Sequence, residues 1–184
     1  MSDRVALSAT GLTDGVVTLR PAADSDVLAI VEACRDPAIQ RYTTVPSDYR
    51  EADAWEWLER SERGRAAGTD FPLLVVDAAD GSLLGSVGVH DLDDQGRCRV
   101  GYWVAAPARG RGVASRALRL LCGWAFEELG VARIELHVEP ENETSQRVAE
   151  RVGFEQEGLL RSFMEVSGAR RDMLSYSLIP GRLR

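Results

Sequence analysis

The chain has 184 residues, a length that fits a single domain spanning 1–184 with a substantial hydrophobic core. Its 45% hydrophobic and 28% charged residues are ordinary for a globular protein in water. A formal net charge of −7 disfavours a nucleic-acid partner, because proteins that bind phosphate backbones are usually basic.

Cysteine and histidine are too few for a disulfide framework or a metal site. Three scattered cysteines form no CxxC pair, and only two histidines are present, so we expect no metal. The opening residues lack the apolar stretch of a signal peptide, and no uncharged run approaches the ~18 residues of a membrane span. We therefore expect a cytoplasmic protein with no membrane partner.

The first half of the chain predicts a strand, three helical stretches and a meander. Short β-branched runs indicate the strands, and apolar residues at helical spacing indicate the helices. Residues 1–15 are polar and are expected to form a flexible N-terminal arm. The predicted elements that follow are a strand at 16–20, a helix over 27–34, a helical turn at 37–41, a loop at 42–49, a helix over 50–67, and strands at 71–76, 83–91 and 98–105.

The second half changes to a strand–helix–strand order. The predicted elements are a helix over 113–129, a strand at 132–139, a helix over 142–152, and a final hairpin of 154–165 with 171–179 across a turn at Ser167-Gly168. A crossover helix makes the fourth and fifth strands of this order parallel. The order predicts a mixed α/β (α+β) sheet of about seven strands with helices on both faces.

The stretch 103–114 joins a buried strand to the long central helix. Arg109, Gly110, Arg111 and Gly112 place two arginines and two glycines in four residues. Glycines let backbone N–H groups crowd around a ligand, and a helix start adds unpaired donors and a positive dipole end. Arginine adds charge and forked donors for phosphate oxygens. The stretch therefore predicts a pyrophosphate site.

Two common nucleotide motifs do not fit this stretch. A Walker A loop ends in Gly-Lys-Ser/Thr, and a dinucleotide fingerprint has a third glycine near the first strand; the segment after Gly110 has neither. Four arginines lie between Pro107 and Arg119 with no acid among them. A solvated arginine loop is the alternative, but these unopposed charges favour a polyanionic ligand.

Several motifs, in order along roughly 16–179, resemble the GNAT superfamily of N-acetyltransferases, and within it the ribosomal-protein (RimJ/RimL-like) branch. The segments that carry the resemblance are Thr18–Pro21, Arg109-x-x-Gly112-x-Ala114, Asn142-x-x-Ser145, Arg151–Gly158 and Arg171–Leu178. The resemblance implies the GNAT acyl-CoA N-acyltransferase fold, with its sheet splayed between the fourth and fifth strands. It also implies acetyl-CoA as the co-substrate.

The resemblance places coenzyme A across the centre of the chain. The residues expected on the pyrophosphate are Arg109, Gly110, Arg111, Gly112, Val113 and Ala114, those expected beside pantetheine are Trp103, Val104 and Ala105, and those expected to face pantetheine and the thioester are Asn142 and Ser145. An edge strand offers donors and acceptors for the two pantetheine amides. Plain helix capping by Asn142 is compatible with this role.

The same resemblance leaves the proton-transfer residues open. Many relatives protonate the leaving thiolate with a tyrosine where this chain has Ala149, so Ser145 is the expected substitute. Some relatives use a strand glutamate as general base where this chain has Arg99, which cannot serve. The remaining candidates for the base are His90, Asp91, Glu135 and His137. An amine that arrives neutral would need no base.

The acceptor is expected to be a primary amine that contacts Tyr42, Tyr49 and Asp91. The branch suggests a protein N-terminal α-amine attacking acetyl-CoA directly in a ternary complex. Antibiotic, polyamine and amino-acid acetyltransferases share the scaffold, and a catalytically idle acyl-CoA sensor is the rival from another class. The resemblance also implies a monomer or homodimer.

Overall fold

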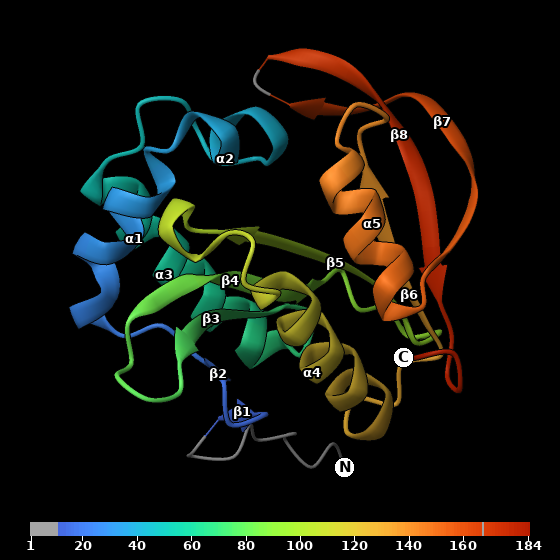
Figure 1. The fold of residues 1–184 in the computed structure, drawn as a ribbon, viewed down its shortest axis with the longest axis horizontal. Coiled ribbons are helices and arrows are strands. Elements are labelled where there is room, and N and C mark those ends of the chain that lie inside the picture. The colour runs from blue at the N-terminus through green and yellow to red at the C-terminus, as the bar shows by residue number, and fades with distance from the viewer. Residues whose placement is uncertain (1–10, 167) are drawn as a thin grey trace.

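A computed structural model describes residues 11–166 and 168–184 (Figure 1). Eight strands form one mixed sheet in the order β1-β2-β3-β4-β5-β6-β8-β7. The strands are β1 (Leu12–Thr13), β2 (Val17–Arg20), β3 (Phe71–Asp77), β4 (Leu83–His90), β5 (Arg97–Val104), β6 (Arg133–Val138), β7 (Glu155–Val166) and β8 (Ala169–Leu178). The helices are α1 (Val27–Cys34), α2 (Pro37–Tyr42), α3 (Glu51–Ala67), α4 (Val113–Glu127) and α5 (Glu143–Val152), with 3₁₀ turns at Asp24–Asp26 and Ala106–Ala108.

Alternation along the strands divides the core between the two faces of the sheet. On one face, Leu73, Val87 and Ile134 pack with Leu118 and Leu121 of α4. On the other, Leu74 and Val76 pack with α1 and α3. Figure 1 shows α4 and α5 together on one side of the sheet and α3 behind it. The predicted arrangement of helices on both faces is confirmed.

The sheet parts between β5 and β6. These strands are parallel, as predicted, but only Arg97, Cys98 and Arg99 have register partners on β6. Within the described part of the chain, β5 runs on to Val104 without a partner on this side, while the other edge of β6 stays paired with β8 from Ile134 to Val138. The last part of β5 is thus an open strand edge in the middle of the sheet, which is the predicted splay.

The N-terminal region differs from its prediction. The arm expected at 1–15 does not extend to β1, because Leu12 and Thr13 pair with Leu19 and Thr18 of β2. Residues 1–10 and the expected turn residue Ser167 lie outside the described part of the chain. Among the described residues no helix is long and apolar enough to cross a membrane.

Gly153 provides a stability test of the helix that carries the candidate site. It ends α5 at φ +109°, and a Cβ there would collide with the carbonyl oxygen of Arg182. We expect Gly153→Ala to lower the free energy of unfolding by about 2 kcal/mol or more, through backbone strain and this clash. Chemical denaturation measures the change.

Gly158 is the matched control, since it has ordinary backbone geometry and open space at its Cβ. Gly158→Ala should change stability by no more than about 0.5 kcal/mol. Equal losses in the two variants would contradict the packing described at the end of α5.

Candidate active site

The loop before α4 presents a row of free backbone donors. Gly110 and Gly112 both adopt φ +76°, a left-handed conformation that favours glycine. Among the described residues, no acceptor is recorded for the backbone N–H groups of 110–114. Gly112 is the N-cap of α4, so the next N–H groups point out of the helix start. This geometry suits an anion.

A cavity of about 480 Å³ adjoins this loop between α4 and α5. The residues that line it are Asp14, Arg111, Gly112, Ser115, Arg116, Arg119, Leu120 and Arg151. Four arginines against one carboxylate make the cavity basic. The Ser115 hydroxyl is buried and has no hydrogen-bond partner among the described residues, although it lines the cavity. A phosphorylated ligand would supply acceptors for these groups.

The prediction that the loop arginines have no opposing acids is wrong. Arg111 lies 3.4 Å from Asp77 and Arg116 lies 2.6 Å from Asp14. The acids come from distant strands and turns and are invisible within the loop sequence. The free N–H groups, rather than an excess of unpaired arginines, are therefore the stronger sign of an anion site.

Arg109 has a structural role that the sequence does not reveal. Its guanidinium donates to the Val104 carbonyl at 3.1 Å and lies 3.0 Å from Asp36, the N-cap of α2. This contact lowers the pKa of Asp36. At the other end of α2, Arg41 binds the nearly buried Glu139 just beyond β6, at 2.7 Å. Two ion pairs thus hold α2 against the ends of both splayed strands.

The residues expected beside pantetheine at the open edge of β5 differ in the direction of their backbone N–H groups. The Ala105 N–H donates to Leu84 at 2.9 Å, so it faces β4 and is already engaged. Because backbone groups alternate along a strand, the Val104 N–H faces the open edge instead. Val104 therefore fits the expected pantetheine contact, whereas the N–H of Ala105 does not.

Across the gap, the start of α5 meets β5 through a pair of hydroxyl groups. Asn142 caps α5 by accepting from the Ser145 N–H at 3.1 Å. The Ser145 Oγ lies 2.8 Å from the phenolic oxygen of Tyr102 on β5. Tyr102 is a site residue that the sequence reasoning missed. Tyr102 follows the buried Val100 by two residues, so the two side chains share a face of β5. This spacing was the signal in the sequence that Tyr102 points toward α5.

His90 lies near Gly101 on the opposite face of the sheet, and alternation along β6 puts His137 on that same face. The His90 ring is next to Gly88 and Gly101, since Cβ atoms there would lie 2.9 Å from its Nε2 and 4.0 Å from its Cδ2. On β6, Glu135 pairs with Arg99, and His137 lies two residues further along, beyond the last register pair with β5. The absence of a side chain at Gly101 leaves open space beside the His90 ring.

Burial is the main reason why the pKa of each imidazole lies below its ordinary value of 6.5. Arg99 lowers both further, whereas Asp70 next to His90 and Glu135 next to His137 oppose the shift. His137 also packs edge-on against Phe163, with ring centroids 4.7 Å apart. Both imidazoles are therefore mainly neutral at pH 7 and able to accept a proton.

The two remaining base candidates are engaged in ion pairs. Glu135 accepts from Arg133 at 2.9 Å, and Asp91 binds Arg99. Arg133 also binds Glu157. The hydrogen bonds from Arg133 and Ser177 lower the pKa of Glu157 to about 2. Because arginines already engage both carboxylates, the geometry favours the histidines over Glu135.

The structure separates the two expected substrate tyrosines. Tyr42 is partly exposed at the end of α2, with the Arg41 guanidinium over its ring. Tyr49 is 5% exposed and packs with Cys34 and Leu58, and its substrate contact stays a prediction. Its aromatic side chain fills the core beneath α1 and α3.

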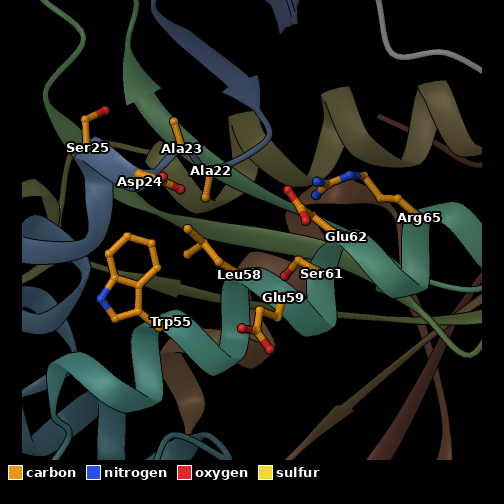
Figure 2. Close-up of a pocket in the computed structure, with 10 residues that line it drawn as sticks. All are labelled: Ala22, Ala23, Asp24, Ser25, Trp55, Leu58, Glu59, Ser61, Glu62 and Arg65. Atoms are coloured by element: carbon orange, nitrogen blue, oxygen red, sulfur yellow. The ribbon is translucent and has the colours of Figure 1, made fainter.

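A second cavity, of about 590 Å³, lies away from the splay (Figure 2). Figure 2 shows Trp55, Leu58, Glu59 and Glu62 of α3 across from the 22–25 segment. None of its lining residues comes from β5, β6, α4 or α5. It is therefore separate from the candidate active site.

Comparison with known proteins identifies the family. Residues 17–155 match the acetyltransferase (GNAT) domain. The chain belongs to the GNAT acetyltransferase family. The predicted superfamily and enzyme class, an N-acetyltransferase, are thereby confirmed.

Relatives of this GNAT chain include YdaF of Bacillus subtilis (strain 168), a candidate ribosomal N-acetyltransferase. It is 37% identical over 132 residues, which are 71% of this chain and 69% of YdaF. Mycobacterium smegmatis RimJ, solved in complex with CoA-disulfide, is 27% identical with a TM-score of 0.82, over 92% of this chain and 85% of that one. These relatives confirm the resemblance to the ribosomal-protein branch.

The fold alone is shared with a spermidine N-acetyltransferase from Vibrio cholerae, solved in complex with CoA and spermine. That chain is 20% identical, with a TM-score of 0.79 over 92% of this GNAT chain and 98% of its own. The fold therefore does not determine the acceptor.

The charge on Arg99 is expected to act on both imidazoles. Arg99→Gln should raise the pKa of His90 and of His137, because it removes the positive charge that lowers both and releases the Asp91 carboxylate. An NMR titration of the two imidazoles measures the shifts.

Arg97→Gln is the matched control, since Arg97 pairs with Asp93 and contributes to neither histidine shift. It should leave both pKa values in place. Movement of only one histidine pKa in Arg99→Gln would contradict the action of this charge on both imidazoles.

Proposed function

We propose that this GNAT enzyme transfers an acetyl group from acetyl-CoA to a protein N-terminal α-amine by direct attack in a ternary complex. The observation that supports this most strongly is the opening between β5 and β6. It has the free N–H groups and the Tyr102–Ser145 pair on the α4/α5 side, and two neutral imidazoles on the other. A thioester in the opening would meet donor-binding and amine-binding groups from opposite faces.

The donor would run along the α4/α5 side. Its pyrophosphate would accept from the N–H groups of 110–114, and its adenosine phosphate would enter the basic cavity beside Ser115, Arg119 and Arg151. Pantetheine would pair with the open edge at Val104. RimJ of Mycobacterium smegmatis supports this co-substrate, because its structure contains a coenzyme A derivative.

The acceptor would approach over Gly101. His90 or His137 would take a proton from the ammonium, directly or through water, and leave the nitrogen lone pair free to attack the acetyl carbon. An open-edge N–H of β5 would stabilise the oxyanion, and Ser145 would face the departing sulfur. Since both imidazole pKa values lie below 6.5, activity should fall as pH drops through that lowered range.

The name of YdaF supports a ribosomal-protein acceptor over a small molecule. The spermidine enzyme supports the second candidate, a small-molecule acetyltransferase, through shared fold alone. An idle acyl-CoA sensor would use the donor side and leave the imidazole face without a role.

An amine panel tests the acceptor. Peptides with a free N-terminus should stimulate thiol release from acetyl-CoA, and the same peptides with a blocked N-terminus should not. Release with spermidine or an aminoglycoside alone would support the small-molecule candidate. Coenzyme A binding without amine-stimulated release would support the sensor.

Gly112 tests the donor site. We expect Gly112→Trp to weaken coenzyme A binding at least about tenfold, because the indole would occupy the space before the free N–H groups. The space around its Cβ is open, so the fold should tolerate the volume. Isothermal titration calorimetry measures the affinity.

Gly130→Trp is the matched control, because Gly130 has φ +66° and similarly open space away from the loop. It should carry the same backbone cost and keep the affinity of the original protein. Unchanged binding in Gly112→Trp would overturn the phosphate-site proposal.

A further inference from the structure

Tyr102 and Ser145 meet inside the opening of the sheet. Tyr102 lies on β5 three residues past the last register pair with β6, and Ser145 lies in the first turn of α5. Their oxygen atoms are 2.8 Å apart. The contact thus spans the two walls between which the thioester is proposed to lie.

The chemistry of the two groups sets the direction of this hydrogen bond. A phenol is a stronger donor and a weaker acceptor than an aliphatic hydroxyl. Burial raises the pKa of Tyr102 to about 12, so its proton stays in place at neutral pH. Tyr102 therefore donates and Ser145 Oγ accepts.

This direction leaves the proton of Ser145 available. Tyr102 is the one hydrogen-bond partner recorded for Ser145 Oγ within 11–166 and 168–184. The backbone N–H of Ser145 is held separately, by the Asn142 cap. A half-buried hydroxyl, fixed by one bond and with its own proton unused, is prepared to donate to a ligand atom in the gap.

We propose that Tyr102 is a positioning residue for the leaving group, which acts through Ser145 on the sulfur of coenzyme A. The inference rests on the donor placement proposed above. By donating to Ser145 Oγ, Tyr102 turns the serine proton toward the sulfur and strengthens that donor through cooperative polarisation. The phenol thus comes from β5 and acts on a serine of α5. One turn beyond that serine, α5 carries Ala149, which is fully buried and apolar.

The bonds and protons balance as follows. The amine lone pair forms the C–N bond while the carbonyl π electrons move to oxygen. The carbonyl then re-forms, the C–S bond breaks, and its electron pair stays on sulfur. The ammonium loses one proton before the attack, and the nitrogen of the tetrahedral intermediate loses a second one. Each proton goes to an imidazole on the opposite face and then to solvent. Ser145 and Tyr102 keep their protons and stabilise the thiolate by hydrogen bonding, and solvent protonates the released thiolate.

Bound coenzyme A reports this contact without any acceptor. Thiolate absorbance during a pH titration gives the pKa of the bound thiol. We expect Tyr102→Phe to raise that pKa by about half a unit to one unit, and Ser145→Ala to raise it by at least as much, because each weakens donation to the thiolate. A tie that only holds β5 to α5 would not change it.

The kinetics should separate in the same way. With an active amine, Tyr102→Phe should lower kcat about tenfold and change the KM for acetyl-CoA by less than about twofold. The double variant Tyr102→Phe/Ser145→Ala should be no slower than Ser145→Ala alone, because the phenol acts through the serine.

Tyr176→Phe is the matched control. Tyr176 is a buried tyrosine on β8 whose hydroxyl bonds to Gln156 at 3.2 Å, away from the gap. It should leave the thiol pKa and kcat in place. An unchanged thiol pKa in Tyr102→Phe would overturn this proposal while leaving the donor site standing. Failure of the original protein to bind coenzyme A would overturn both.

Discussion

The short pairing of β5 with β6 is the constraint on which the site depends. Three register pairs join the strands before β5 and β6 separate, and β6 stays paired with β8 on its other edge. Buried residues of β4, β6 and α4 hold the two sides in one hydrophobic core, so the separation costs few apolar contacts. What it leaves is a strand edge with unpaired backbone groups in the interior of a sheet. Proteins usually cover such an edge, and here a ligand chain can do so.

The alternation of side chains gives the opening two chemically different walls. Residues of β5 that point toward α5 include Tyr102, whereas Gly101 lies beside His90 on the other face. A hydroxyl donor and a proton acceptor are thus separated by one strand. That separation lets each keep its own environment, with a phenol whose pKa is raised on one side and imidazoles whose pKa is lowered on the other.

Local pattern predicted most of the fold, because the strands and helices carry their own alternation or spacing. β1 escaped prediction since two residues have no period and depend on pairing with β2. The glycine loop and the Asn142 cap were also predictable from the local sequence. Contacts between distant residues were not: the Tyr102–Ser145 bond, the acids that pair the loop arginines and the burial of Tyr49 all arise from packing.

The two ion pairs of α2 have a mechanical consequence. Asp36 joins α2 to the loop after β5 through Arg109, and Arg41 joins it to the segment after β6 through Glu139. Strand pairing joins β5 to β6 at one end, and α2 joins the segments that follow them at the other. The opening is therefore bounded at both ends. The ion pairs of α2 thus add contacts at the end of the opening where β5 and β6 are not paired. Two reactants would enter this opening through opposite faces of the sheet, so neither would have to dissociate before the other could bind.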